Sequence, residues 1–342
     1  MKVFILLFMV SCAKVSYIVE QGIGQISLEY NDIDNQDFLN DPKQNKEHKE
    51  KVKIVEKAKG YFFNYYNLKS YPIYDEVKIL DQKAVSYLVI HSPKNEIKAM
   101  STSFPFLGKF PYLGFFSEDS AIAYATDKKA EGYQIYMRSV YAYSTLNNPF
   151  WPFHDNILSS FFIYKKRELT ELVFHELVHT IIFVGNNVGF NENLAQFIAR
   201  EMMTEYFKYS ATELKKIERR RDKSHQLNQL IVQHAQKLNQ RYQSEKADFD
   251  TIGNDYLNKV FYPSMKKYCK DHTLTSCWPL KGEWNNARFA AFKTYEAKQN
   301  EIKKLYQQLN LPLKDFVLLL IKLEKDYDGK SNFITFVKNK VK

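Results

Sequence analysis

Hydrophobic residues recur at spacings of three and four between residues 165 and 184, and this pattern predicts an amphipathic helix. Its apolar positions are Leu169, Leu172, Val173, Leu177, Ile181 and Val184. No Gly or Pro interrupts the run before Gly185, and Gly185 to Gly189 predicts a helix stop and a turn. A second apolar helix follows, for which Asn191 is a suitable N-cap.

The same reasoning predicts the other elements of the chain. Helical patterns cover residues 46–68, 117–129, 204–243, 248–268, 284–309 and, as two short helices, 312–341. Alternating patterns predict strands at 85–91 and 133–143, and residues 104–116 favour an irregular loop or an edge hairpin. The expected fold class is α+β and mainly helical, with a small sheet beside the 165–184 helix and a helical C-terminal half.

Two histidines on the 165–184 helix carry the candidate chemistry. His175 and His179 are four residues apart, so they project from one face, one turn apart, and can meet on one cation. Glu176 follows His175 and can accept a proton from a metal-bound water. This is the H-E-x-x-H pattern of zinc peptidases. The alternative is a pair of histidines that are satisfied inside an apolar core.

A third ligand is expected from the second helix. Glu192 is placed in its first turn, and the short return loop brings that turn toward His175 and His179. Two imidazoles and one carboxylate, with a fourth position left to water, form the arrangement of a catalytic zinc site. Ala195, one turn further on, lets the two helices approach closely. The predicted cofactor is one Zn²⁺; alternatively, Glu192 only complements the helix dipole.

Composition limits the partners. The chain has 342 residues, of which 45% are hydrophobic, so it can bury a sizeable core. Its net charge is +10, but the densest basic run, 215–223, also carries Glu218 and Asp222. We interpret this run as a solvated helix face and expect no nucleic-acid partner. A basic surface also suits a protein held near anionic lipid.

The N-terminus and the cysteines point to export. Met1-Lys2, the apolar run 3–10 and Ser11-Cys12 resemble a bacterial lipoprotein signal, in which Cys12 is lipidated; an ordinary cleaved signal is the alternative. We therefore expect anchoring at the bacterial cell envelope, on the periplasmic side of the outer membrane in a diderm. In an exported protein Cys269 and Cys277 could close a small loop as a disulfide.

Several blocks follow one another along the chain: Ser11-Cys12 with Gly24-Gln25, Phe104-Pro105 with Gly108, Tyr112 to Phe116, Ala142 to Leu146, Phe174 to His179, Phe190-Asn191-Glu192 with Ala195, and Asn285-Asn286-Ala287 with Tyr295. Together they resemble the bacterial family named putative aminopeptidase, which contains predicted zinc peptidases that are often lipoproteins. The resemblance implies His175, His179 and Glu192 as ligands and Glu176 as the catalytic residue. The chain departs from the family pattern at Phe115, Asn147, Asn156 and Val178.

The predicted organisation has four parts. They are a signal peptide (1–11), an N-terminal α+β part (12–150), the zinc-site helices (151–210) and a helical C-terminal part (211–342). Residues 12–342 are expected to form one catalytic unit. The strand within 133–145 is the candidate for binding a peptide backbone by strand addition.

The expected function is zinc-dependent hydrolysis of a peptide or protein on a zincin-like fold. Tyr143 is the expected oxyanion donor, with His154 and Tyr295 as alternatives. The aminopeptidase activity rests on the family resemblance, because the Gly-x-Met-Glu-Asn strand that binds a free amine in the well-known zinc aminopeptidases is absent. An endopeptidase acting on envelope proteins and a non-catalytic envelope binding or assembly protein are the alternatives.

Overall fold

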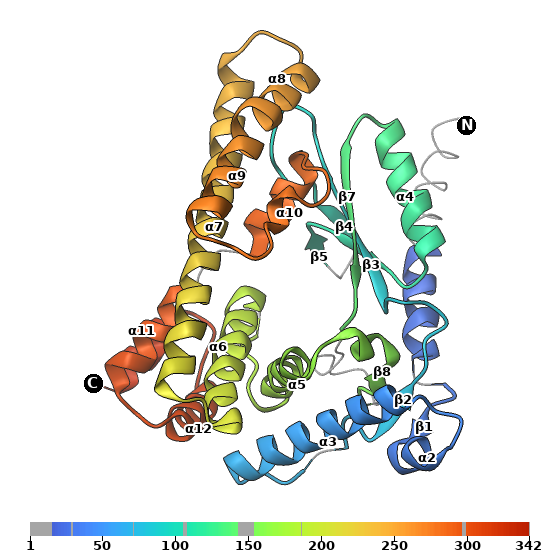
Figure 1. Ribbon diagram of the computed structural model, residues 1–342, viewed down its shortest axis with the longest axis vertical. Helices are drawn as coiled ribbons and strands as arrows, with labels where there is room; N and C mark the ends of the chain where they lie inside the picture. Colours follow the sequence, from blue (N-terminus) through green and yellow to red (C-terminus); the bar gives the residue numbers. More distant parts are fainter. Residues whose placement is uncertain are drawn as a thin grey trace. The chain divides into compact units, whose positions relative to one another are not determined.

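The structure is a computed structural model of the chain (Figure 1). It describes residues 16–28, 30–70, 72–104, 108–142, 154–185, 187–295 and 299–341. These residues form two compact units, each built from three separate segments of the chain. The first unit comprises the described residues up to Gln25 and those within Ser86–Val140 and Lys215–Glu296. The second comprises those within Ile26–Val85, Tyr141–Leu214 and Ala297–Lys342.

An antiparallel sheet organises the first unit. Its strand order is β6 (Leu113–Phe115), β3 (Ser86–Ser92), β7 (Gln134–Val140), and a separate hairpin pairs β4 (Thr102–Phe104) with β5 (Gly108–Phe110). Side chains of β3 alternate between two helices, so this strand is buried on both faces. Its His91 meets Tyr124 of α4 (Glu118–Ala130), whereas Ile90 packs on Ala287 of α10 (Asn286–Tyr295) (Figure 1).

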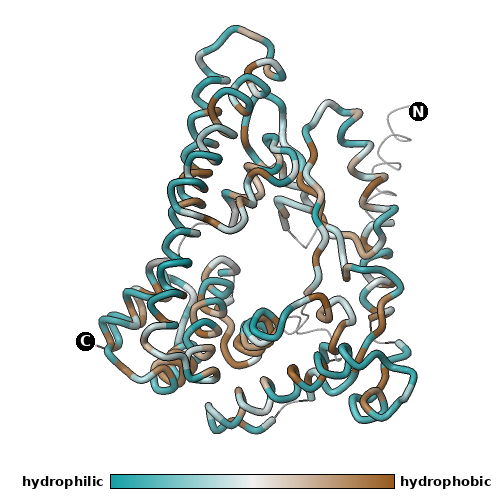
Figure 2. The backbone as a smooth tube through the Cα atoms, in the orientation of Figure 1, coloured by the Kyte–Doolittle hydropathy of each residue, from teal (hydrophilic) through white to brown (hydrophobic). Residues whose placement is uncertain are grey.

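Helices complete the first unit. They are most of the helix at residues 16–27, most of α7 (Ala211–Ser244), α8 (Phe249–Tyr256) and α9 (Tyr262–Asp271). A π-helical turn at Leu257–Phe261 lies between the last two. Helix α7 is largely hydrophilic along its length (Figure 2). Its buried side chains form one stripe, made of Leu227, Ile231, His234, Ala235, Leu238 and Tyr242. This stripe packs on the core of the unit around Phe261 and Phe289.

The second unit is mainly helical. Its sheet has the order β1 (Ile33–Asp34), β2 (Glu76–Lys78), β8 (Ile157–Leu158), with β2 and β8 parallel. Its helices are α2 (Asn35–Asn40), α3 (Lys46–Tyr66), α5 (Lys166–Ile181), α6 (Val188–Phe207), α11 (Gln299–Leu309), α12 (Leu313–Glu324) and α13 (Phe333–Lys340). A 3-10 turn, Ser159–Ile163, connects β8 to α5.

Aromatic side chains join the central helices of the second unit. Phe174 of α5 is fully buried and contacts Tyr61 and Phe62 of α3 and Tyr206 of α6. On the other side of α6, Phe197 contacts Tyr306 of α11 and Phe316 of α12. Phe190, near the start of α6, contacts Phe333 of α13. Helix α6 therefore packs against α5 and against the C-terminal helices α11, α12 and α13.

The predicted mainly helical α+β class is confirmed, as are most of the long helices. The predicted 204–243 helix is instead divided: α6 ends at Phe207, Lys208 takes a left-handed conformation (φ 50°), and α7 starts at Ala211. The 284–309 pattern likewise forms two helices, α10 and α11. Within the described residues, no helix combines the length and apolar character needed to cross a membrane.

Candidate metal centre

Helix α5 presents His175, Glu176 and His179 as its sequence predicts. Its first turn is stabilised by Glu168, whose carboxylate accepts a hydrogen bond from the Lys165 N–H at 3.0 Å. Val173, Phe174, Leu177 and Val178 are buried, so they fix which face of the helix turns inward. With that face fixed, the two histidines project together toward α6.

The turn from α5 to α6 differs from the prediction. Asn191 is not the N-cap, because α6 already starts at Val188 after Asn187. Its side chain is buried and bonds the preceding turn instead: the Val184 N–H donates to Asn191 Oδ1, and Asn191 Nδ2 donates to the Val184 carbonyl, each at 2.9 Å. Glu192 consequently lies in the second turn of α6 rather than the first, so a helix-dipole role does not account for it.

The three predicted ligands come together. His175 Nε2 lies 3.2 Å from Glu192 Oε2, His179 Nε2 lies 3.5 Å from Glu192 Oε1, and the two Nε2 atoms are 3.3 Å apart. A tetrahedral ion with bonds of about 2.0–2.1 Å needs donor atoms about 3.3–3.4 Å apart. The two Nε2 atoms meet this spacing, whereas each imidazole contacts a different oxygen of Glu192. One ligand atom from each of the three residues lies within 4.8 Å of the other two. These residues can hold a metal ion.

Exposure differs around the triangle. The side chain of His179 is only 5% exposed, whereas that of Glu192 is 55% exposed. Nδ1 of His179 is buried and has no hydrogen-bond partner among the described residues. The Nε2 atoms of both histidines face Glu192, which is the orientation that metal ligation needs. One side of the site is thus enclosed by the protein, and the other is open to solvent and to a further ligand.

The charges of the three groups suit a cation. Burial lowers the pKa of His179 to about 4, and the neighbouring His175 adds to this effect, so His179 is neutral at pH 7. Burial opposes ionisation of Glu192, but its hydrogen bond to His175 and the two imidazoles outweigh this and lower its pKa. Burial also lowers the pKa of His175, yet Glu192, Glu176 and Glu171 overcome it and the net shift is upward. A neutral imidazole and a carboxylate are ready ligands, and His175 binds a metal only in its neutral form.

A second connection between the helices lies one turn from the ligands. Gln196 Nε2, on α6, donates to Glu171 Oε1, on α5, at 2.7 Å, and Arg200 approaches the same oxygen at 3.4 Å. Glu171 precedes His175 by four residues, and Gln196 follows Glu192 by four. This pairing was missed by sequence analysis, although the spacing of one turn from each ligand is a signal that could have found it.

Tyr74 is a further neighbour that the sequence did not reveal. Its side chain is buried, its hydroxyl has no hydrogen-bond partner among the described residues, and its backbone is left-handed (φ 59°). Burial raises the pKa of Tyr74 well above its usual value, and the charges of Glu176 and Asp155 raise it further. A bulky residue with positive φ is rare. The Tyr74 N–H donates to the Asp155 carbonyl at 2.8 Å, which fixes this conformation.

The remaining predicted residues have different outcomes. Tyr143 and Cys12 lie outside the described residues, as does the side chain of Tyr295. His154 is half-buried in the segment before β8. Cys269 and Cys277 form a disulfide in the first unit, with an S–S distance of 1.98 Å.

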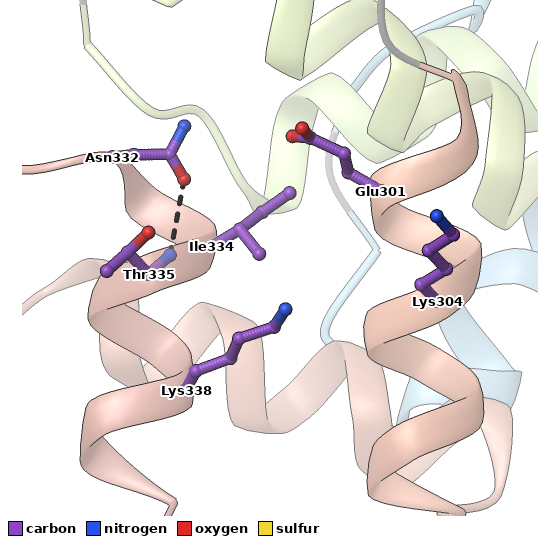
Figure 3. A pocket seen from close by; sticks show the side chains of 6 residues that line it. All are labelled: Glu301, Lys304, Asn332, Ile334, Thr335 and Lys338. Atoms are coloured by element: carbon purple, nitrogen blue, oxygen red, sulfur yellow. Dashed lines mark hydrogen bonds between the residues drawn. The ribbon is translucent and has the colours of Figure 1, made fainter.

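A cavity of about 330 Å³ lies between α11 and α13 of the second unit (Figure 3). Glu301 and Lys304 line it from α11, and Lys338 faces them from α13. None of the three metal-site residues lines it, so it is separate from the candidate metal centre. A much smaller cavity shares Glu301 and reaches Asn193, next to Glu192.

The chain matches a known protein family. A family model described as "putative aminopeptidase" matches residues 16–332, which is most of the chain and includes the whole metal centre. No curated protein and no solved structure matches the chain significantly.

Proposed function

The chain belongs to the family described as putative aminopeptidase, and from this premise we propose that it is a zinc-dependent peptidase of zincin type, anchored at the cell envelope. The family description supports the function of a peptidase, whose substrate is a peptide or a protein. The observation that supports zinc is the cluster of His175, His179 and Glu192, in which the two Nε2 atoms are 3.3 Å apart and lie 3.2 and 3.5 Å from the two oxygens of the carboxylate. Two imidazoles, one carboxylate and an open side form the donor set of a catalytic zinc site.

In this proposal the residues of the chain have separate tasks. His175, His179 and Glu192 would hold the ion, which supplies Lewis acidity toward the scissile carbonyl and the attacking water. Glu176 accepts the proton of that water as the C–O bond forms. It then delivers the proton to the amine nitrogen as the C–N bond breaks. Tyr143 remains the proposed donor to the oxyanion.

The architecture around Glu176 supports its role as the base. It follows a ligand on the same helix, and its charge is felt by His175 and by Tyr74. A carboxylate in this place can exchange a proton with a bound substrate without leaving the helix that holds two of the ligands.

The first test is metal content. Purified wild type should bind about one zinc per chain, whereas His179→Ala and Glu192→Ala should each lose it. Glu176→Gln should keep the metal and lose peptide turnover. Full turnover in Glu176→Gln would refute the mechanism. Zinc-free wild type, after zinc has been offered, would favour the non-catalytic binding or assembly protein.

The position of cleavage and the anchor need their own tests. A peptide with a free amine, compared with the same peptide acetylated at its N-terminus, distinguishes an aminopeptidase from an endopeptidase. The aminopeptidase should cleave only the free form. For the anchor, metabolic labelling with a fatty acid should mark the wild type in a bacterial host and leave Cys12→Ala unlabelled.

A further inference from the structure

The helix of residues 16–27 exposes an apolar face. Ile23 is 64% exposed and Ile26 is 58% exposed, and Ile18 and Val19 are also exposed one turn earlier. These positions repeat every three or four residues, so they form one continuous stripe along the helix. Glu20 is the only charged residue between positions 16 and 28. The outward face therefore offers apolar surface and no attraction for a charged partner.

The opposite face packs on the first unit and carries polar side chains beside Tyr17 and Gly24. Glu20 Oε1, Gln21 Nε2 and Gln25 Nε2 are buried, and none has a hydrogen-bond partner among the described residues. A soluble helix normally buries its apolar side and exposes its polar side. Here the isoleucines face outward, while three polar atoms are buried on the inner side at a cost in stability.

Two contacts fix this orientation. The hydroxyl of Tyr17 donates to the Gly114 carbonyl at 2.8 Å, and its ring meets Phe115 edge-on at 5.3 Å. A Cβ at Gly24 would collide with the ring of Phe116, so only glycine fits against it. Because Tyr17 and Gly24 hold the inward face closely, the helix cannot rotate to bury its isoleucines.

The chain before the helix indicates what covers the apolar face. Residues 3–10 are apolar, and only Ala13, Lys14 and Val15 separate Cys12 from the helix. Four residues extend over at most about 14 Å. An acyl chain on Cys12 would thus keep the start of the helix within that distance of a bilayer surface. Its uncharged, isoleucine-rich face is suited to the boundary between headgroups and acyl chains.

We propose that helix 16–27 lies on the membrane surface, with Ile18, Val19, Ile23 and Ile26 inserted among the lipids. It would seat the first unit on the bilayer instead of leaving it on a loose tether. This inference deepens the proposed envelope anchoring and rests on it. The helix and the acyl chain then form two signals, the combination that gives stable membrane attachment.

The test uses residues 13–342, which lack the acylation site Cys12 and so report on the helix alone. This version retains every described contact, because the described residues begin at residue 16. Its partitioning onto phosphatidylcholine vesicles is measured by flotation, since zwitterionic lipid removes attraction by the net positive charge. The parent should bind, and about 0.5 M salt should not release it. Ile23→Ser with Ile26→Ser should weaken partitioning by about 10- to 30-fold.

The matched control is Ile122→Ser with Ile163→Ser, which removes isoleucines that are 47% and 57% exposed elsewhere. It should change partitioning by less than about twofold. No flotation of the parent, or equal losses in both double variants, would overturn the proposal. The proposal would also be overturned if the parent self-associated and only the Ile23→Ser, Ile26→Ser variant did not. In that case a second copy of the protein would cover the apolar face. Fatty-acid labelling of Cys12 tests the anchor separately, so the two can fail independently.

Discussion

Replacing Asn191 with alanine should destabilise the turn that places Glu192 beside the histidines. Asn191 is buried, and its amide makes two hydrogen bonds of 2.9 Å to the backbone of Val184, which is also buried. Alanine would leave the Val184 N–H and carbonyl without partners inside the protein. Each such buried group costs about 1–3 kcal/mol, so the expected loss for the two groups is about 2–6 kcal/mol if water reaches neither.

The same change should weaken the metal site. Glu192 is the next residue, and its oxygens lie 3.2 and 3.5 Å from the two imidazoles. A displacement of this backbone alters those distances, and a disturbed supporting shell lowers metal affinity by about 10- to 100-fold. The assays are urea unfolding of the metal-free protein and competition for zinc against a fluorescent chelator. Hydrogen exchange over residues 182–200 locates the effect in the turn.

Asn193→Ala is the control. It removes the same side chain two residues later, where its amide donates to the Gly189 carbonyl on the exposed side of α6. Its cost should stay below about 0.5 kcal/mol, and zinc affinity should not change. If Asn191→Ala behaved in the same way, the two buried hydrogen bonds would not be what holds the turn, and our explanation of how Glu192 is positioned would be refuted.

Three further predictions concern other buried groups. His234 is buried and hydrogen-bonded to Tyr256, and burial lowers its pKa to about 4. Because the unfolded chain takes up a proton near pH 6.5, the free energy of unfolding should be highest above that pH and should fall by about 3 kcal/mol as the pH drops toward 4. His234→Gln should remove this pH dependence in urea titrations at a series of pH values. The disulfide between Cys269 and Cys277, eight residues apart, closes a short loop and should stabilise the fold by about 2.5 kcal/mol. A reductant should therefore lower the unfolding midpoint of the wild type and leave that of the double alanine variant unchanged. Tyr74→Phe removes a buried hydroxyl that has no partner among the described residues, so thermal unfolding should show equal or greater stability; a loss above about 1 kcal/mol would mean that the hydroxyl is paired.

Local signals in the sequence were enough for the isolated helices. Helix α3 begins after Asn45 and ends before Asn67, whose φ of 54° is a common helix stop, and its pattern predicted both ends closely. Helix α4 likewise starts after Ser117, whose side chain accepts a hydrogen bond from the Ser120 N–H. In these helices the capping residues and the hydrophobic spacing predict the same boundaries, and tertiary contacts do not change them.

The start of α6 shows where local reasoning fails. Gly189 and Asn191 have the composition of a turn, yet both lie in the helix. Phe190 packs on Phe333, which is far away in the sequence, and the Asn191 amide is occupied by Val184. These contacts outweigh the weak preference of the residues themselves, and no pattern within the segment could reveal them.

The candidate metal centre was predictable in part for the same reason. His175, Glu176 and His179 form a fixed spacing on one helix, and Glu192 follows after a short turn. Tyr74 lies about a hundred residues earlier in the sequence. Only the fold brings it close enough to Glu176 for that charge to raise its pKa. The division into two units built from alternating segments depends wholly on distant contacts, so hydrophobic patterning could not reveal it.

The aromatic contacts of α6 also set an order for biosynthesis. The residues of the metal centre leave the ribosome long before Tyr306, Phe316 and Phe333, the partners of Phe197 and Phe190 on α11, α12 and α13. Until these last helices are made, one side of α6 lacks its cover, and the second unit cannot close. The second unit therefore completes its packing only when translation is nearly finished. A premature stop before α11 would yield a product with every proposed ligand and no stable site.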